Sequence, residues 1–474
     1  MSRAAYFLIR GCLAAGLACA ALAGCASDPA AVPQGLAIPA HFDGAGRTGS
    51  DVTRWWTRFG SKPLTALVAK AEAGNFDMAA AAARIEQADA QQRIAGAALL
   101  PGVTGTGNVS RSQSSGTSAG GGRVTQPSPR SSVSGVLAAS YELDVWGRNR
   151  DILRAATSDA EASVYAREVV RLTTQAGVVN AFLQLAAARD RLAIANENLR
   201  DALRVLGVLR ERLAAGTGNA LEVAQQESLV ATQRAAIPVL RQNADIARTT
   251  IALLLGRPPE GFALAAASLD LLRTPSVAPG LPALLLTRRP DLRNIEALLA
   301  GDNASVEAAR KALLPSIQLT GQGGLQSAAF STLLRPESAI WTLAAGITQP
   351  IFDGGRLRAQ VALSEAQRLE RLELYRKAII SALVDVENAL TAIRESAARE
   401  AAQRVAVAKG REAFRFAEQR LREGTIDLQA LLNTQTTLFQ AQDALVQDRL
   451  SRLQSAVSLF QALGGDFAAP LPAR

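Results

Sequence analysis

The spacing of hydrophobic residues switches between a helical and a strand-like period along this chain, and the switch occurs twice. Two stretches without proline, 148–212 and 357–421, carry apolar residues at heptad positions. In the second stretch these are Ile379, Leu383, Val386, Leu390, Ile393 and Ala397. Such spacing predicts one helix over each stretch. At ~1.5 Å per residue, each helix would be about 97 Å long, far longer than globular helices usually are.

Shorter helical segments flank each long helix. We expect them over 78–100 and 220–255 in the first half of the chain and over 291–314 and 428–463 in the second half. The two short segments of each half together nearly equal the long helix in length, so they can line it when stacked end to end. Glycine-containing turns, such as the one at Gly216, would reverse the chain at the far end of each long helix.

The period of the pattern falls to two just before each long helix. From Val133 to Val145, from Ile317 to Leu325 and from Trp341 to Ile347, apolar residues alternate with polar ones. This alternation predicts β-hairpins at about 102–146 and 316–352, whose strands have one apolar and one polar face. Each strand is close to the ~9–11 residues that span a bilayer. Open strand edges leave backbone groups unpaired in hydrocarbon, so four strands must combine with those of other copies.

The same motifs occur in the same order in both halves of the chain. Gly147-Arg148 recurs as Gly355-Arg356, and Arg212-Leu213 recurs as Arg420-Leu421 at the same offset. The first half carries extra residues in the Gly- and Ser-rich tract 112–132, where an exposed loop tip would tolerate them. We therefore expect two structural repeats.

These landmarks divide the chain into six parts. They are a signal peptide at 1–24, a lipidated extended segment at 25–60, a first repeat at 61–256, a linker at 257–290, a second repeat at 291–464 and a C-terminal tail at 465–474. The expected fold class is a mainly α-helical, mixed α/β membrane protein with four strands per chain.

The N-terminus has the features of a lipoprotein signal. Arg3 and Arg10 precede an apolar stretch that ends in Leu22-Ala23-Gly24-Cys25, and small residues before a cysteine suit the signal peptidase. We expect Cys25 to begin the mature protein and to carry a diacylglycerol and an N-acyl chain, with ordinary cleavage or an uncleaved anchor as alternatives. Ala26, the next residue, permits transfer to the outer membrane.

Composition excludes several classes of site. Cys12 and Cys19 lie in the signal peptide, and His41 is the single histidine, so neither a disulfide, a metal site nor a histidine-based triad is expected. Acids are interspersed with the bases that give the net charge of +9, which does not favour nucleic acid as a partner. After the signal, no charge-free apolar run reaches the ~18 residues of a membrane helix. Without a phosphate loop or nucleophile arrangement, we expect no enzyme activity and no cofactor besides the lipid on Cys25.

Several motifs resemble those of the TolC-type outer-membrane factor family, in its NodT/OprM-like lipoprotein group found with RND efflux pumps. In chain order they are Trp55-Trp56 with Phe59, Tyr141-Glu142-Leu143-Asp144-Val145-Trp146-Gly147-Arg148, Arg288-Arg289-Pro290-Asp291-Leu292, Leu313-Leu314-Pro315 and Gln349-Pro350-Ile351-Phe352-Asp353-Gly354-Gly355-Arg356. The resemblance implies a homotrimer in the outer membrane. Its 12-stranded transmembrane β-barrel would continue into a periplasmic α-helical barrel that docks to a periplasmic adaptor protein and an RND-type inner-membrane pump.

The resemblance also points to residues at the periplasmic tip, where the long helices of this family close the channel like an iris and acidic rings narrow it. By position, Glu222 and Asp427 are the candidates for such a ring, although acids at helix N-termini also serve as caps. Many relatives have aspartate where this chain has Asn433, so the inner acidic ring is expected to be missing. Arg420 and Arg422 would either bridge neighbouring tips or compensate the helix dipole.

We therefore expect the outer-membrane channel of a tripartite efflux system, which conducts small toxic solutes or drugs passively to the exterior. Two alternatives stay open: the outer-membrane duct of a secretion system, and a structural periplasmic coiled-coil lipoprotein in which the alternating hairpins are incidental. The sequence identifies neither the cargo nor the adaptor and pump.

Overall fold

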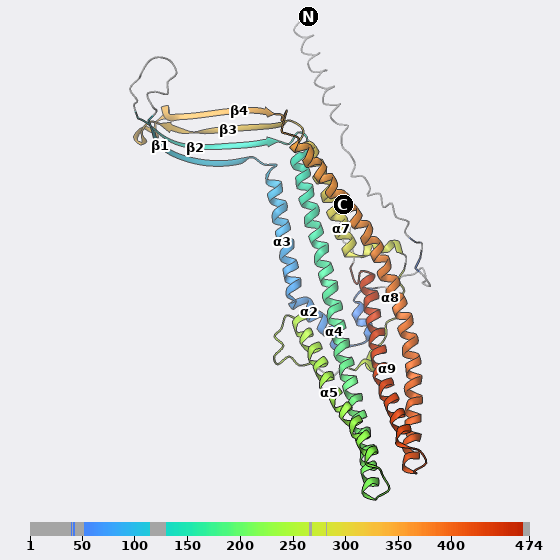
Figure 1. The fold of residues 1–474 in the computed structure, drawn as a ribbon. Helices are drawn as coiled ribbons and strands as arrows, with labels where there is room; N and C mark the ends of the chain where they lie inside the picture. Colours follow the sequence, from blue (N-terminus) through green and yellow to red (C-terminus); the bar gives the residue numbers. More distant parts are fainter. Residues whose placement is uncertain are drawn as a thin grey trace. The chain divides into compact units, whose positions relative to one another are not determined.

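The computed structural model describes residues 39, 41–42, 52–113, 129–264, 268–280 and 282–467. All of them belong to the unit that begins at Pro39, and only this unit is described below. The signal peptide, Cys25 and most of the Gly- and Ser-rich loop tract lie outside the described residues. Within this unit, long helices continue into one antiparallel sheet (Figure 1).

Two helices of equal length dominate the unit. Helix α4 covers Arg148–Ala214 and helix α8 covers Arg356–Arg422, with 67 residues each. Both match the predicted stretches to within two residues. Each follows a glycine with positive φ, Gly147 at 81° and Gly355 at 86°, a conformation that residues with a Cβ adopt only at a cost. The Gly-Arg motif of the two repeats therefore marks where a strand turns into a long helix.

The shorter helices stack end to end along the long ones, as predicted. Helices α3 (Phe76–Ala97) and α5 (Ala220–Leu254) both pack against α4, while α7 (Pro290–Lys311) and α9 (Leu428–Ala462) both pack against α8. Helices α7 and α9 also pack against α4, so each lies between the two long helices. The helical layer therefore has the order α3/α5, α4, α7/α9, α8.

The two end-to-end junctions are built alike. Asn75, just before α3, donates through Nδ2 to the Leu254 carbonyl at the end of α5 at 2.9 Å. Arg289, just before α7, donates through Nη1 to the Ala462 carbonyl at the end of α9 at 3.3 Å. Gly256 follows α5 and Gly464 follows α9. A side chain at either position would clash, because a Cβ would lie 2.2 Å (Gly256) or 2.0 Å (Gly464) from a backbone oxygen of the abutting segment. The repeated Leu-Gly motif thus marks the helix junctions.

Strands β1 (Gly102–Ser112), β2 (Arg130–Leu143), β3 (Ser316–Ser327) and β4 (Ala339–Thr348) form one antiparallel sheet in that order. In the chain, α3 leads into β1, β2 into α4, α7 into β3 and β4 into α8. Each strand therefore prolongs one column of the helical layer, and the order of columns is the same in both parts. Short turns η4 (Phe330–Thr332) and η5 (Pro336–Ser338) connect β3 to β4.

One compact region was not predicted. The 3₁₀ helix η1 (Trp55–Phe59) lies in the segment that we expected to be extended, and helix α2 (Lys62–Gly74) follows it with Ser61 as its N-cap. Trp55 and Phe59 are completely buried, and Trp55 stacks on Phe460 of α9 at 5.2 Å between ring centroids. The elements η1 and α2 form an additional layer at mid-height of the long helices. The linker elements η2 (Leu269–Leu271), η3 (Pro282–Leu284) and α6 (Leu285–Arg288) belong to the same layer.

The largest core cluster lies at this level and joins α2, α4, α5, α9 and the linker. Among the described residues, no helix is both long and apolar enough to cross a bilayer.

Candidate functional site

The sheet has one continuous apolar face. Residues paired directly in an antiparallel sheet point to the same side, and one such row runs Val103, Ala139, Gly321, Leu343. All odd-numbered strand residues share this face. Several of them are exposed large hydrophobic residues: Val109 at 76%, Leu137 at 65%, Trp341 at 77%, Leu343 at 77% and Ile347 at 72%. An apolar face of this size without cover marks a contact surface for lipid or protein.

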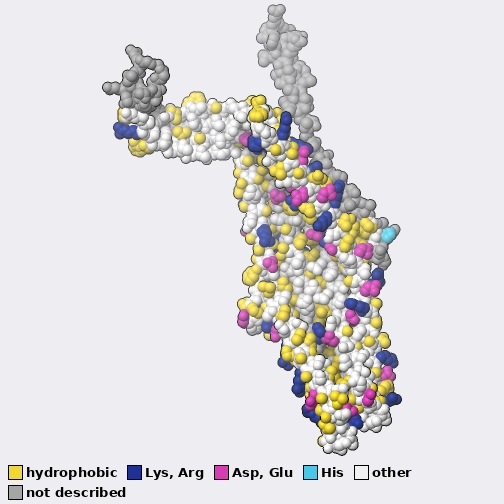
Figure 2. Space-filling view, viewed as in Figure 1, with side chains coloured by type: hydrophobic (Ala, Val, Ile, Leu, Met, Phe, Trp, Pro, Cys, Tyr) yellow, Lys and Arg dark blue, Asp and Glu magenta, His cyan; other side chains and the backbone are white. Residues whose placement is uncertain are grey.

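The opposite face is polar and nearly free of charge. A row directly beside the first one runs Thr104, Ala138, Gln322, Thr342, and serine, threonine, asparagine and glutamine occupy most of the other even-numbered positions. On the side shown in Figure 2, charged side chains are spread over the helices and scarce over the strands. The predicted alternation is therefore confirmed, and the sheet separates an apolar side from one that suits water.

Carboxylates cap both long helices at the turns from strand to helix. Asp144 accepts the backbone N–H groups of Asn149 at 3.0 Å and Arg150 at 2.9 Å. Asp353 accepts those of Gly355 at 3.0 Å and Leu357 at 2.9 Å. The first backbone N–H groups of a helix have no partner within it, and an acid there also opposes the helix dipole. The aspartates of the two Gly-Arg motifs thus hold the join between strands and helices.

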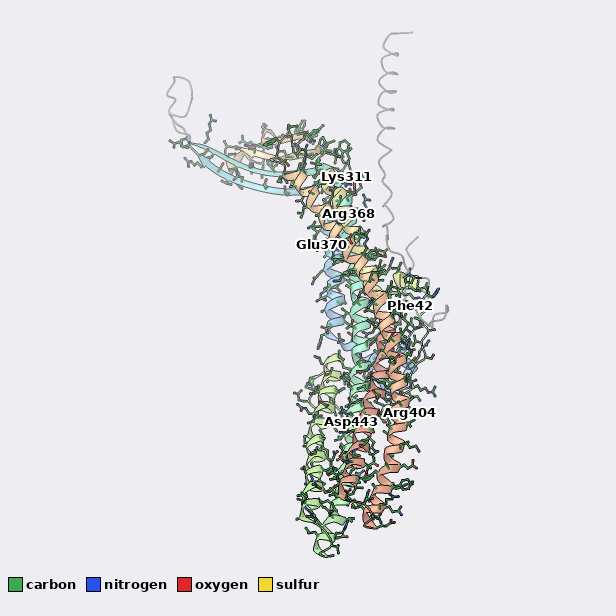
Figure 3. The ribbon with its side chains drawn as sticks, turned by 45° about the vertical axis from the view of Figure 1, so that its right-hand side comes forward. Phe42, Lys311, Arg368, Glu370, Arg404 and Asp443 are labelled. Carbon is green, nitrogen blue, oxygen red and sulfur yellow. The ribbon has the colours of Figure 1, made fainter. Side chains whose placement is uncertain are left out.

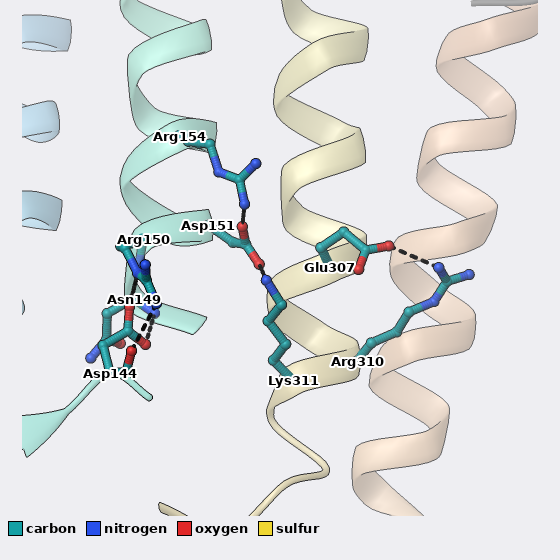
Figure 4. A network of polar contacts seen from close by, with 8 residues as sticks. All are labelled: Asp144, Asn149, Arg150, Asp151, Arg154, Glu307, Arg310 and Lys311. Carbon is teal, nitrogen blue, oxygen red and sulfur yellow. Dashed lines mark hydrogen bonds and ion pairs between the residues drawn. The ribbon is translucent and has the colours of Figure 1, made fainter. Parts of the chain in front are cut away.

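A buried charge cluster lies beside this join. Asp151 is completely buried and forms ion pairs with Arg154 and with Lys311, whose Nζ lies 2.5 Å away (Figure 4). Arg310 on α7 pairs with Glu307 on its own helix and with Glu365 on α8 at 2.7 Å. These contacts connect α4 to α7 and α7 to α8 directly below the sheet, so the columns leave the strands in a fixed arrangement.

A second buried carboxylate lies further down the helices and was missed by sequence analysis. Glu400 on α8, 2% exposed, pairs with Arg404 at 2.5 Å and with Arg452 on α9 at 2.9 Å. Burial alone would raise the pKa of Glu400, but the hydrogen bond from Arg452 and the charges of the arginines outweigh it, so the pKa lies below its usual value. Figure 3 shows Arg404 and Asp443 at this level and Lys311 near the strands.

The far tip contains the residues proposed for the gate. Asp427 is the N-cap of α9, where it accepts the N–H of Ala430 at 2.9 Å. Glu222 lies in the first turn of α5, but Asn219 is the cap of that helix. Asp427 therefore caps its helix, whereas Glu222 is not a cap and lies where its charge favours the helix dipole.

Asn433, Arg420 and Arg422 are exposed at the same tip. Asn433 is exposed and accepts a hydrogen bond from Gln429 at 3.1 Å. Arg420 is exposed, and its carbonyl accepts the N–H of Thr425 at 2.9 Å in the turn after α8. Arg422 pairs with Glu418 on its own helix at 2.8 Å.

Glu418 connects the two long helices at the tip. It also pairs with Arg204 of α4 at 3.0 Å, so Arg204, Glu418 and Arg422 form one network across α4 and α8. Burial would raise the pKa of Glu418, but hydrogen bonds and charges of Arg204 and Arg422 outweigh it and lower the pKa. Below this network, a cluster that includes Leu209, Phe414, Leu428 and Phe439 fills the tip. The two helical hairpins of one chain are therefore joined there by both charge and apolar contact.

His41 is exposed, and no group of ligating side chains that could hold a metal ion occurs among the described residues.

The chain matches the family model described as outer membrane efflux protein over residues 67–257 and 281–465. The part between the two matched segments, residues 258–280, lies within the linker.

Two relatives that match over most of their length are outer membrane proteins of export or efflux. The pyoverdine export outer membrane protein OpmQ of Pseudomonas aeruginosa is 41% identical over 457 residues, which cover 94% of this chain and 95% of OpmQ. The probable efflux pump outer membrane protein TtgC of Pseudomonas putida is 32% identical over 411 residues, which cover 86% of this chain and 84% of TtgC. The solved structure of the outer-membrane channel OprN superposes with a TM-score of 0.85 at 27% identity, covering 93% of this chain and 98% of OprN.

Proposed function

Because this chain belongs to the outer membrane efflux protein family, we propose that three copies of it close one channel and dock to a periplasmic adaptor and an RND-type inner-membrane pump. The chain has the TolC-like fold, and it is the outer-membrane channel component of an efflux system. The trimer, the adaptor, the pump and the lipid anchor are the parts that we propose.

The unpaired edges of the sheet carry the proposal. Among the described residues, β1 pairs only with β2 and β4 pairs only with β3. An open edge in hydrocarbon leaves backbone N–H and carbonyl groups without partners, at several kcal/mol for each group. Pairing of β1 in one copy with β4 in the next removes these edges. In a closed ring of three copies, the apolar face would meet lipid and the polar face would line the channel.

The helical edges support the same closure. On α5, Val239, Ile246 and Leu253 follow one another at heptad spacing and are 55%, 54% and 73% exposed. On α8, the opposite edge of the layer, Val384 and Val405 are 48% and 62% exposed. Apolar stripes on long helices are normally buried in helix–helix contacts. A neighbouring copy that presents its other edge would bury both stripes.

The lipid anchor is proposed from the sequence. The stretch Leu22-Ala23-Gly24-Cys25 follows a charged and then apolar N-terminus, which is the pattern of a lipoprotein signal. Acyl chains on Cys25 would hold the N-terminal segment at the inner leaflet of the outer membrane. Mass spectrometry of the mature N-terminus tests this, because the lipid adds a defined mass that Cys25→Ser removes.

The cargo is proposed to be small solutes delivered by the pump. Export of pyoverdine or a related molecule is the specific candidate, because the 41% identical relative OpmQ is a pyoverdine export protein. Export of toxic solutes is the broader one, in line with the efflux role of TtgC. A duct for protein secretion is the alternative within the same fold.

Conductance separates a channel from a structural coiled-coil lipoprotein. Purified protein added to a planar bilayer is expected to give discrete ion-conducting steps and, on gels, to migrate as an oligomer until heated. A protein that gives no conducting events would be a scaffold. A deletion strain should also become sensitive to toxic compounds or lose export of a pyoverdine-like solute. Unchanged susceptibility and export, with loss of a secreted protein, would favour the secretion duct.

A further inference from the structure

A cavity of about 590 Å³ lies where α7 and α9 abut, between α4 and α8. Its volume is within the range of small-molecule sites. Polar side chains from three helices line it. They are Thr173 of α4, Asn388 of α8 and, on α9, Ser451, Gln454, Ser455, Ser458 and Gln461. The helix junction opens this space, because the column formed by α7 and α9 is interrupted there.

The cavity opens on one definite side of the helical layer. Residues three and four apart share a helix face, so Leu453, Val457 and Phe460 form one face of α9, which is buried in the core around Trp55. Ser451, Ser455 and Ser458 lie on the opposite face. The layer formed by η1 and α2 therefore covers one side of the wall, and the cavity opens on the other.

In the proposed channel this other side is the inner one. A layer such as η1 and α2 inside the ring would obstruct the passage, whereas outside the ring it leaves the passage open. The cavity then faces the lumen at mid-height of the helices. This step rests on the proposed function.

The polar side chains of the cavity have hydrogen-bonding groups to spare. Within the part of the chain that the structure describes, the side chains of Asn388, Gln454, Ser458 and Gln461 form no hydrogen bond. Each amide offers two N–H donors and one carbonyl acceptor, and the hydroxyl offers both functions. The cavity can therefore form several hydrogen bonds to a solute without breaking any of its own.

The charges of the cavity do not favour anions. Arg289, the cation among the lining residues, is already bound to Asp291 at 2.8 Å, to Asp385 at 3.0 Å and to the Ala462 carbonyl at 3.3 Å. Two carboxylates thus face one guanidinium, and the remaining lining is neutral. An anionic solute would meet a fully paired arginine and an excess of negative charge.

We propose that this cavity is a weak binding site in the channel wall for neutral solutes rich in amide and hydroxyl groups. Weak binding on the path holds such a solute briefly at mid-height of the channel without trapping it, since conduction needs sites that release as readily as they bind. Anionic solutes of the same size should bind there more weakly.

Single-channel recording with a defined peptide tests the proposal. The probe is N-acetyl-Ser-Gly-Ser-Gly-amide, and its partner N-acetyl-Asp-Gly-Asp-Gly-amide carries negative charge. In the wild-type channel, the neutral peptide should cause transient partial blocks that last longer than those of the anionic one. Loss of the two amides in Gln454→Leu/Gln461→Leu should shorten these blocks roughly five- to tenfold, as expected for the loss of two hydrogen bonds.

Gln440→Leu is the matched control. Gln440 is an exposed residue of the same helix and does not line the cavity, so block durations should equal those of the wild type. Equal durations in wild type and Gln454→Leu/Gln461→Leu, or shortening by Gln440→Leu as well, would overturn the proposal while leaving the channel function intact. Absence of conductance in the wild type would instead overturn the channel itself.

Discussion

Asp427 illustrates how one acidic side chain can be read in two ways. Its carboxylate accepts the N–H of Ala430 at 2.9 Å and so caps α9, but its exposed position at the tip also suits an acidic ring. Asparagine separates the two roles, because it is as good a cap as aspartate and carries no charge.

We therefore expect Asp427→Asn to leave thermal stability unchanged and Asp427→Ala to destabilise the tip by about 1 kcal/mol. Thermal melting of the detergent-solubilised protein measures this. Cation selectivity in planar bilayers is expected to stay the same in Asp427→Asn if capping is the whole role. A loss of selectivity in Asp427→Asn as large as in Asp427→Ala would assign the residue to a charged ring.

Asn433 is exposed in the second turn of α9. Introducing aspartate there in every copy places several like charges around the tip, which concentrates cations. Asn433→Asp is expected to raise the cation-to-anion permeability ratio above that of the wild type. Gln429→Glu, one turn closer to the tip on the same helix face, shows how the effect depends on the level of the charge along the channel. Reversal potentials in a salt gradient give the ratio, and an unchanged ratio in Asn433→Asp would refute the idea.

Glu418 should make the tip sensitive to acid. Its pKa is lowered in the folded protein, so its ion pairs stabilise the tip above the ordinary pKa of glutamate and lose this effect as the pH falls through the lowered value. Arg204 and Arg422 are 47% and 56% exposed, so solvent screens both ion pairs of Glu418. Together they should contribute about 1 kcal/mol, which corresponds to roughly a fivefold change in the ratio of closed to open channels.

Channel recordings at several pH values test this. At neutral pH, Glu418→Gln should open more often than the wild type, and once the pH is below the lowered pKa of Glu418 the two should coincide. Glu412→Gln is a suitable control, because the ion pair of Glu412 is with Lys409 on the same helix. A difference between wild type and Glu418→Gln that persists unchanged in acid would exclude this mechanism.

Single residues also show where prediction from sequence stops. The pairing of Arg422 with Glu418 could have been found, since residues four apart on a helix are neighbours. The third member, Arg204, belongs to the other repeat, and only the packing of α4 beside α8 brings it to Glu418. Glu400 also pairs across helices, because its partner Arg452 is on α9 of the same repeat. Contacts within a helix follow from spacing, while contacts between helices depend on a packing that spacing does not encode.

The helices and strands agree with the sequence-based prediction more closely than the side-chain contacts do. The two long helices end within two residues of the predicted limits, because no proline interrupts them and glycine turns bound them. Helix α2 and the turn η1 were missed, since the short segment around Trp55 has no clear period and folds by burying three aromatic rings in the core that includes α4 and α9. The strands could be predicted because apolar residues, on one face of the sheet, alternate with polar residues on the other.

Adjacent residues of β4 test these two faces. Leu343 lies on the apolar face and Ala344 on the polar one, near the middle of the strand. An arginine on the lipid face at the centre of a bilayer costs about 2–4 kcal/mol, whereas one on the lumen side changes selectivity. We expect Leu343→Arg to reduce the heat-modifiable oligomer, and Ala344→Arg to form it normally and shift reversal potentials toward anions. Normal assembly of Leu343→Arg would show that this face does not meet lipid.

The proposed assembly of several copies rests on the edges that one copy leaves unpaired. The columns of strand and helix run in one order, and the first and last of them have no neighbour within the described chain. A contact between unlike edges is heterologous, and such contacts either close into rings or continue without end. The curvature of the wall decides between these outcomes, and for this chain the family resemblance points to a ring of three.

Cysteine cross-linking can count the copies, because Cys25 is the only cysteine outside the predicted signal peptide. Thr106 of β1 and Ala344 of β4 lie near the middle of the two edge strands. Neighbouring strands are ~4.8 Å apart, so in Thr106→Cys/Ala344→Cys a short bis-maleimide should join copies into dimers and trimers. Thr106→Cys alone should stay monomeric, because its copies would be separated by the intervening strands. Since a closed ring has no further edge to offer, bands larger than a trimer, or cross-links that need only one cysteine, would mean that the edges do not meet in a ring of three.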